Sequence, residues 1–141
     1  MYEELGNFID GEWVKDNKKG ENVLNPANEN VLAFLPHASE KDLEKSLESA
    51  ERGFKIWSKT PVQERAAILH KTADLIDDRA DKIASIITLE QGKPIKESKG
   101  ELQRTVETFR WNAEYAIKNI DDRSVLRSNG LKQKVRVEPL G

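Results

Sequence analysis

Apolar residues recur every three or four positions between residues 40 and 119, and this helical period predicts four helices. We expect these helices at about 40–57, 61–76, 79–91 and 95–119. Charged residues occupy the opposite face of each pattern, so each helix has one stripe to bury, and small residues in the second stripe permit close helix packing. The first two stripes are Leu43, Leu47, Ala50 and Phe54, and Ala66, Leu69, Ala73 and Ile76.

The first two helices carry start signals. Ser39 followed three residues later by Asp42 predicts a capping box in which Asp replaces the more common Glu. Thr60 before Pro61 predicts a second start, because a hydroxyl can cap the helix and proline suits its first position. Gln63, three residues after Thr60, completes that expected box.

The third and fourth helices are separated by a turn. Asp77-Asp78 predicts the cap of the third helix. Gly92 predicts its left-handed end, and Pro94 prevents the helix from continuing. The fourth helix is the longest, and its apolar stripe consists of Leu102, Val106, Phe109, Ala113, Ala116 and Ile117.

Trp111 and Tyr115 lie off the stripe of the fourth helix. Their position predicts a second contact surface, which is typical of a helix at the centre of its layer. A ligand stacked on the two rings is an alternative, but aromatic residues at helical spacing more often serve packing.

Three β-hairpins flank the helices. Asp10-Gly11 predicts a two-residue type I′ turn between strands at 7–9 and 12–14. A polar stretch at 15–22 is expected to be a loop, and a second hairpin should follow with its turn at 26–30. Asn129-Gly130 predicts the third hairpin, which ends in the alternating strand 131–137. That strand has one apolar face, so it should pair with another subunit, or the chain is part of something longer.

Composition narrows the functional classes. The chain has 141 residues, 37% hydrophobic and 34% charged, with a net charge of -2 and no long block of like charge. A nucleic-acid partner is therefore not expected. The absence of cysteine excludes disulfides, a thiolate zinc site and a catalytic cysteine within these residues. Neither a signal peptide nor a membrane span is indicated, so we expect a cytoplasmic protein without a membrane partner.

No catalytic constellation is visible in the sequence. It contains no Gly-x-Gly-x-x-Gly or phosphate-loop motif, and His37 and His70 stand apart from other metal-ligating residues. The pairs Asp77-Asp78 and Asp121-Asp122 could serve acid–base chemistry or bind a hard cation, but helix capping explains them more simply. The residues alone predict a mainly helical domain.

Several motifs in order nevertheless resemble the amino-terminal segment of the NAD(P)-dependent aldehyde dehydrogenase superfamily. The strongest is Thr88-Leu89-Glu90-Gln91-Gly92-Lys93-Pro94 with the later Gly100-Glu101. The succinate-semialdehyde and lactaldehyde dehydrogenases are the most similar branch in appearance. The other motifs are Phe8-Ile9-Asp10-Gly11-Glu12-Trp13, Asn25-Pro26-Ala27, Glu64-Arg65-Ala66, Trp111-Asn112-Ala113-Glu114 and Glu138-Pro139-Leu140-Gly141.

The resemblance implies an α/β fold, the aldehyde dehydrogenase fold, for the parent enzyme. The present chain would be mainly α, with four helices, amino-terminal β-hairpins and a carboxyl-terminal β-hairpin. Residues 1–122 would form the amino-terminal helical layer of the cofactor domain. Residues 123–141 would begin the strand extension through which subunits pair, and the strand 131–137 would then make a homo-oligomer.

The resemblance also implies a reaction, the oxidation of a small aldehyde or semialdehyde to the acid with NAD or NADP. No catalytic or dinucleotide-binding residue of the family matches a position in this chain, so we expect the 141 residues alone to be inactive and to bind no cofactor. Some members hold a structural monovalent cation, and the matching positions are Asn28 and Glu101. The rival interpretation is a stand-alone helical interaction or scaffold module.

Overall fold

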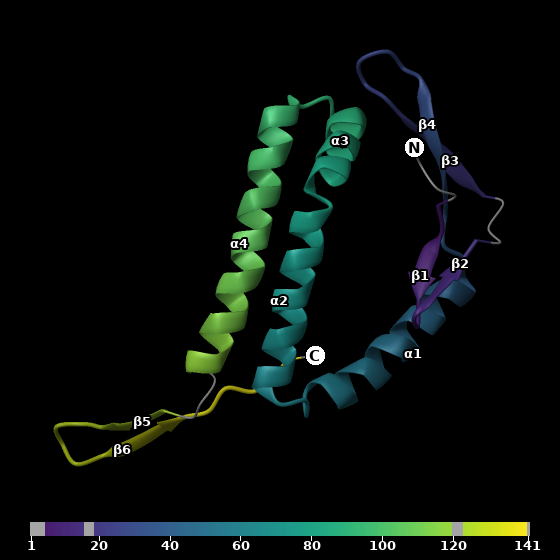
Figure 1. Ribbon diagram of the computed structural model, residues 1–141. Coiled ribbons are helices and arrows are strands. Elements are labelled where there is room, and N and C mark those ends of the chain that lie inside the picture. Colours follow the sequence, from purple (N-terminus) through teal and green to yellow (C-terminus); the bar gives the residue numbers. More distant parts are fainter. Residues whose placement is uncertain (1–4, 16–18, 120–122, 141) are drawn as a thin grey trace.

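The computed structural model describes residues 5–15, 19–119 and 123–140. Four helices and three separate two-stranded antiparallel sheets make up this part of the chain (Figure 1). The helices are α1 (Glu40–Trp57), α2 (Val62–Asp78), α3 (Ala80–Gln91) and α4 (Ile95–Asn119). The strands are β1 (Asn7–Ile9), β2 (Glu12–Val14), β3 (Gly20–Leu24), β4 (Val31–Pro36), β5 (Arg123–Leu126) and β6 (Lys132–Val135).

The core lies between α4 and the α2–α3 pair. In Figure 1, α3 follows α2 almost end to end, and α4 runs back alongside both. Small side chains on α2 let the helix axes approach closely, as the sequence predicts. The buried apolar residues are Ala66, Ala73, Ala84, Leu102, Val106 and Ala113.

A hydroxyl pair, of which Ser98 is buried and Thr88 half-buried, links α3 to α4. Ser98 is fully buried, and its Oγ lies 3.0 Å from Thr88 Oγ1. The turn between these helices confirms the prediction, because Gly92 has a φ of 73° and its N–H donates to the Thr88 carbonyl at 2.9 Å. The pair satisfies two polar groups that burial would otherwise penalise.

Two predicted helix caps are wrong. Thr60 does not cap α2, because its Oγ1 donates backwards to the Ile56 carbonyl at 3.0 Å and no side chain caps this helix. Asp77 and Asp78 belong to the last turn of α2, and α3 also begins without a side-chain cap. At Thr60 the hydrogen bond to the Ile56 carbonyl takes the place of the cap. At Asp77 and Asp78 the cap is absent because α2 continues through both residues. The capping box of Ser39 and Asp42 is confirmed in full.

The hairpins follow the predicted order with local differences. Asp10 and Gly11 both have positive φ, 55° and 83°, as a type I′ turn requires. The second hairpin begins earlier than expected, because polar residues 20–22 pair with β4. In the third hairpin Gly130 has a positive φ of 81°, and the hydrogen bond from the Arg127 N–H to the Leu131 carbonyl at 2.8 Å closes a three-residue loop, 128–130. The strand after this loop, β6, is Lys132–Val135 and is shorter than the predicted strand 131–137.

Helix α1 runs apart from the helical core and contacts the first hairpin. Asp10, in the β1–β2 turn, accepts hydrogen bonds from Arg52 at 2.8 Å and from Ser49 at 3.0 Å. The apolar stripe of α1 is not covered, with Leu43 56% and Leu47 72% exposed. Burial of this stripe within the described chain, which the period suggests, is therefore not observed.

Candidate functional site

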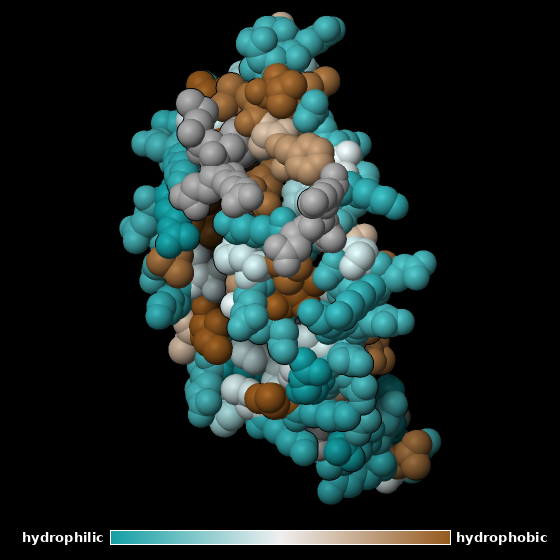
Figure 2. Space-filling view, turned by 90° about the vertical axis from the view of Figure 1, so that its right-hand side faces the viewer, coloured by the Kyte–Doolittle hydropathy of each residue, from teal (hydrophilic) through white to brown (hydrophobic). Residues whose placement is uncertain are grey.

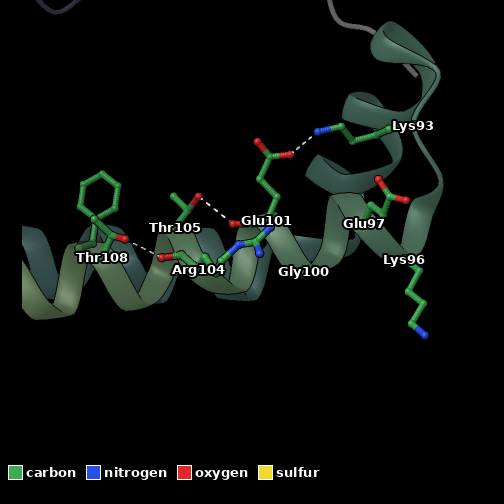
Figure 3. Close-up of a pocket in the computed structure, with 9 residues that line it drawn as sticks. Lys93, Lys96, Glu97, Gly100, Glu101, Arg104, Thr105 and Thr108 are labelled. Atoms are coloured by element: carbon green, nitrogen blue, oxygen red, sulfur yellow. Dashed lines mark hydrogen bonds and ion pairs between the residues drawn. The ribbon is translucent and has the colours of Figure 1, made fainter.

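A cavity of about 880 Å³ lies beside the first half of α4 (Figure 3). It contains Glu101, one of the two residues that the sequence suggests as cation ligands. Its other lining residues are Lys93, Lys96, Glu97, Gly100, Arg104, Thr105, Thr108 and Phe109.

An ion pair dominates this cavity. Lys93, which follows the left-handed Gly92, reaches over the first turns of α4 and donates from Nζ to Glu101 Oε2 at 2.6 Å (Figure 3). This hydrogen bond and the charge of Lys93 hold the pKa of Glu101 below its ordinary value, with a smaller attraction from Arg104. The pair therefore stabilises the fold above the unfolded-state pKa of Glu101 and is lost as the pH falls through the folded-state pKa.

The hydroxyl groups of the cavity are used by α4 itself. Thr105 Oγ1 donates to the Glu101 carbonyl at 3.0 Å, and Thr108 Oγ1 donates to the Arg104 carbonyl at 2.8 Å. Neither hydroxyl has a hydrogen-bonded base that would activate it as a nucleophile. The charged side chains of the cavity can attract ions. Covalent catalysis needs a nucleophile that is hydrogen-bonded to a general base, and the cavity contains no such arrangement.

The other expected cation ligand, Asn28, lies in the β3–β4 turn. Its Oδ1 accepts a hydrogen bond from the Asn30 N–H at 3.1 Å. The same turn approaches the turn between α3 and α4, because a Cβ placed on Gly92 would lie 3.1 Å from Pro26 Cγ. The two segments are thus neighbours, but the side chains of Asn28 and Glu101 are each engaged with another partner.

A second charged cluster ties α2 and α3 to α4. Arg110 lies 2.9 Å from Asp74 and 3.7 Å from Asp77, and the hydrogen bond from Arg110 to Asp74 is the main cause that raises the pKa of Arg110. Lys99 pairs with Asp81 at 2.7 Å and lowers its pKa. Asp77 thus has a structural partner, Arg110, that sequence spacing did not indicate. The other predicted pair, Asp121-Asp122, lies outside the described residues.

Metal and aromatic candidates acquire simple structural roles. His37 Nε2 lies 3.5 Å from Glu21, and His70 is half-buried on α2. Within the described residues no group of three His, Cys, Asp or Glu could hold a metal ion.

Trp111 and Tyr115 stack on each other with ring centroids 4.8 Å apart, and both are exposed on α4. The described chain therefore leaves their predicted second contact surface open.

The sheets of the described residues differ from those that hold a dinucleotide in α/β folds. The three described sheets are two-stranded and antiparallel, whereas dinucleotide sites use the carboxyl ends of parallel strands and a glycine-rich turn. In the same part of the chain, no helix is both long and apolar enough to cross a membrane.

Comparison with known sequences matches residues 13–141 to the Aldehyde dehydrogenase family. One curated relative, the malonate-semialdehyde dehydrogenase of Bacillus pumilus (strain SAFR-032), is 41% identical over 110 residues. That alignment includes 77% of this chain but only 23% of the relative. The chain thus spans about a quarter of the length of the curated relative.

Solved structures agree with this assignment. Aldehyde dehydrogenase 21 from Physcomitrella patens, in complex with the reaction product succinate, aligns with a TM-score of 0.82 and 27% identity. The alignment covers 92% of this chain and 27% of that structure. Betaine aldehyde dehydrogenase from Staphylococcus aureus, in complex with NAD+, aligns with a TM-score of 0.79 and 27% identity over 87% of this chain and 25% of that one. These alignments confirm the expected fold class, a mainly helical portion of a larger α/β fold.

Proposed function

The chain belongs to the aldehyde dehydrogenase family, and on that premise we propose that it is the amino-terminal part of an NAD(P)-dependent enzyme that oxidises a small aldehyde or semialdehyde to the acid. The observation that carries this proposal is the family match over residues 13–141. The semialdehyde class is supported by the name of the Bacillus relative and by succinate in the Physcomitrella structure.

Within such an enzyme, residues 1–122 form the helical layer of the cofactor domain, and residues 123–141 begin the strand extension used for oligomerisation. The close packing of α2, α3 and α4 around buried Ala73 and Ala113 supports a rigid layer. The exposed strands β5 and β6 support a role in pairing between subunits, because a solitary hairpin is marginally stable in water. We place this enzyme in the cytoplasm.

The 141 residues alone are inactive in this proposal. They contain no cysteine to act as the nucleophile of the family reaction, and the cavity beside α4 offers no substitute. The purified chain, assayed with malonate semialdehyde and either NAD+ or NADP+, should form no reduced cofactor above the buffer background. Reduction above that background would contradict this assignment.

The product of the longer reading frame provides the positive test. It should oxidise at least one member of a panel of small aldehydes and semialdehydes, with reduced cofactor and acid formed in equal amounts. A folded, longer product that is inactive with the whole panel would contradict the proposed activity. A stop codon directly after codon 141 would instead favour the stand-alone interaction module, which the open α1 stripe also supports.

A monovalent cation bound by Asn28 and Glu101 remains part of the proposal. The contact of the β3–β4 turn with Gly92 supports it, because this contact places Asn28 on a segment next to the α3–α4 turn, which leads into the helix of Glu101. The ammonium group of Lys93 now neutralises Glu101, so a bound cation must share or displace that partner. The carboxyl signal of Glu101 therefore reports directly on cation binding.

A further inference from the structure

Three asparagine side chains of the described chain form the same kind of turn. In each, the amide oxygen accepts a hydrogen bond from the backbone N–H two residues further on: Asn25 from Ala27 at 2.9 Å, Asn28 from Asn30 at 3.1 Å, and Asn129 from Leu131 at 3.1 Å. This hydrogen bond directs the side chain along the chain, towards the residue that follows. The amide carbon, Cγ, therefore lies near the backbone nitrogen of that next residue.

The next residue decides what each turn can do. A backbone nitrogen that loses its proton is a nucleophile, and its attack on Cγ closes a five-membered imide ring and releases ammonia. In the first turn the next residue is Pro26, which has no N–H to lose. In the second it is Glu29, whose side chain crowds the closing ring. In the third it is Gly130, where a Cβ would meet nothing within 4 Å apart from its chain neighbours, so the nitrogen is open to reaction.

The loop 128–130 also favours the attack. Leu131 N–H donates to Asn129 Oδ1, the atom on which negative charge develops when a nitrogen adds to Cγ. Residues 123–140 are all exposed, so water and hydroxide reach the loop. The Gly130 N–H donates to the Arg127 carbonyl at 2.9 Å, and this hydrogen bond must open first. Opening costs little free energy in an exposed hairpin loop, so the bond slows the attack without preventing it.

The related pair in the first hairpin, Asp10-Gly11, is held by side chains of α1. Asp10 accepts from Arg52 at 2.8 Å and from Ser49 at 3.0 Å, and an ionised carboxylate is a poor electrophile. The first two hairpins and α1 occupy one side of the molecule, where hydrophobic clusters lie between hydrophilic side chains (Figure 2). The third hairpin projects from the other side (Figure 1). A reaction in its loop therefore leaves the contacts of the first hairpin unchanged.

We propose that Asn129 is a site of spontaneous deamidation, at which the Gly130 nitrogen displaces ammonia from Cγ and water then opens the imide. The bond from Gly130 N to Asn129 Cγ forms, the Cγ–Nδ2 bond breaks, and the proton of the Gly130 N–H passes to hydroxide or water. Water adds to one of the two imide carbonyls and leaves aspartate or isoaspartate at this position. One water is consumed and one ammonia released, with no change of oxidation state. The inference is independent of the proposed dehydrogenase activity.

The product changes the hairpin in two ways. Either product adds a negative charge to the exposed loop, and isoaspartate also lengthens the backbone of the loop by one methylene. In the intermediate imide the Gly130 nitrogen carries no hydrogen, so its hydrogen bond to the Arg127 carbonyl is lost. The third hairpin is therefore the part of the described chain whose charge and loop length we expect to change with time.

Peptide mapping of the purified chain during incubation at mildly alkaline pH tests the inference. We expect Asn129 to be converted with a mass gain of about 1 Da and to become a substrate of protein isoaspartate methyltransferase, while Asn25 and Asn28 stay intact. The rate should rise with pH, because the nucleophile is the deprotonated nitrogen. Asn129→Gln should react at least about tenfold more slowly, because its longer side chain must close a larger ring.

Glu29→Gly is the matched variant that should create a second site. Glu29 has a φ of 59°, which glycine adopts readily, so the substitution should keep the turn. It places glycine after Asn28, whose side chain makes the same hydrogen bond as that of Asn129, and should speed the conversion of Asn28 at least about tenfold.

Three results would overturn the inference. The first is an Asn129 that stays intact in the folded chain while a short peptide of residues 126–132 is converted, or that reacts only after the chain is unfolded in urea. The second is an equal rate of ammonia release from the chain and from Asn129→Gln. The third is an Asn28 that stays unreactive in folded Glu29→Gly, because the hydrogen-bonded turn followed by glycine would then be insufficient for the reaction.

Discussion

At the scale of single residues, side chains that look chemically reactive in the sequence are engaged in structural contacts. Glu101 accepts from Lys93 at 2.6 Å, and Asp77 lies 3.7 Å from Arg110. The carboxylates could be identified from sequence as candidates. Their partners could not, because Lys93 reaches Glu101 across a helix turn and Arg110 approaches Asp77 from another helix.

The first prediction concerns the acidity of Glu101. Lys93→Met removes the hydrogen bond and the charge that are the largest causes of the lowered pKa, so this pKa should rise towards its ordinary value. A pH titration of the Glu101 carboxyl by NMR measures the change. As the pKa rises, the variant should lose the stabilisation that the pair provides above the unfolded-state pKa.

Lys96→Met is the matched control, because Lys96 lines the same cavity but is not among the causes of the Glu101 shift. An equal effect of both variants would contradict the role of Lys93. The same resonance tests the proposed cation site. It should move when K+ or Na+ replaces tetramethylammonium at constant ionic strength, and this response should disappear in Asn28→Ala.

At the scale of elements, the helices and their turns agree closely with the periodicity and the special residues of the chain. The structure confirms α4 at 95–119 and the left-handed Gly92. The start of α2 differs, because Thr60 donates to the preceding helix. A start signal is local, but the hydroxyl has competing acceptors that become available only when the neighbouring helix has formed.

The second prediction follows from this difference between two caps. Ser39→Ala removes the acceptor for the Asp42 N–H and should destabilise the start of α1 by about 1 kcal/mol, a roughly fivefold loss of amide protection. Thr60→Ala, by contrast, removes no cap and should leave protection of the first α2 amides nearly unchanged. Hydrogen exchange measures both, and an equal loss at the two helix starts would contradict the capping assignment.

At the scale of the whole molecule, packing is concentrated in α2, α3 and α4, whereas α1 and the last hairpin present apolar side chains to solvent. Val135 is 44% exposed and Val137 60% exposed at the end of the chain. This distribution is typical of a portion of a larger assembly. The exposure of these side chains agrees with the alignment, in which the chain matches only 23% of the Bacillus relative.

The third prediction concerns self-association through the last hairpin. The chain should form oligomers at micromolar concentration. The double substitution Val135→Lys and Val137→Lys should shift it towards monomer, because exposed apolar side chains at the end of β6 and just after it then carry charge. Sedimentation velocity over a concentration series measures the change. Lys132→Ala with Lys134→Ala, on the alternate face, is the control. A monomer at all concentrations, or equal effects of both pairs, would contradict pairing through this face.

Sequence patterns were sufficient to predict the four helices, the three hairpins, the left-handed conformations of Asp10-Gly11 and Gly92, and the family, but not the left-handed Glu29. Helical period, Asp10-Gly11 and Gly92 carry this information locally, since backbone preferences act over a few residues. The pairing of Glu101 with Lys93, the burial of Ser98 against Thr88 and the exposure of the α1 stripe became visible only in the folded chain. These outcomes depend on which elements meet in space, and an amphipathic pattern specifies a face to be covered without specifying what covers it.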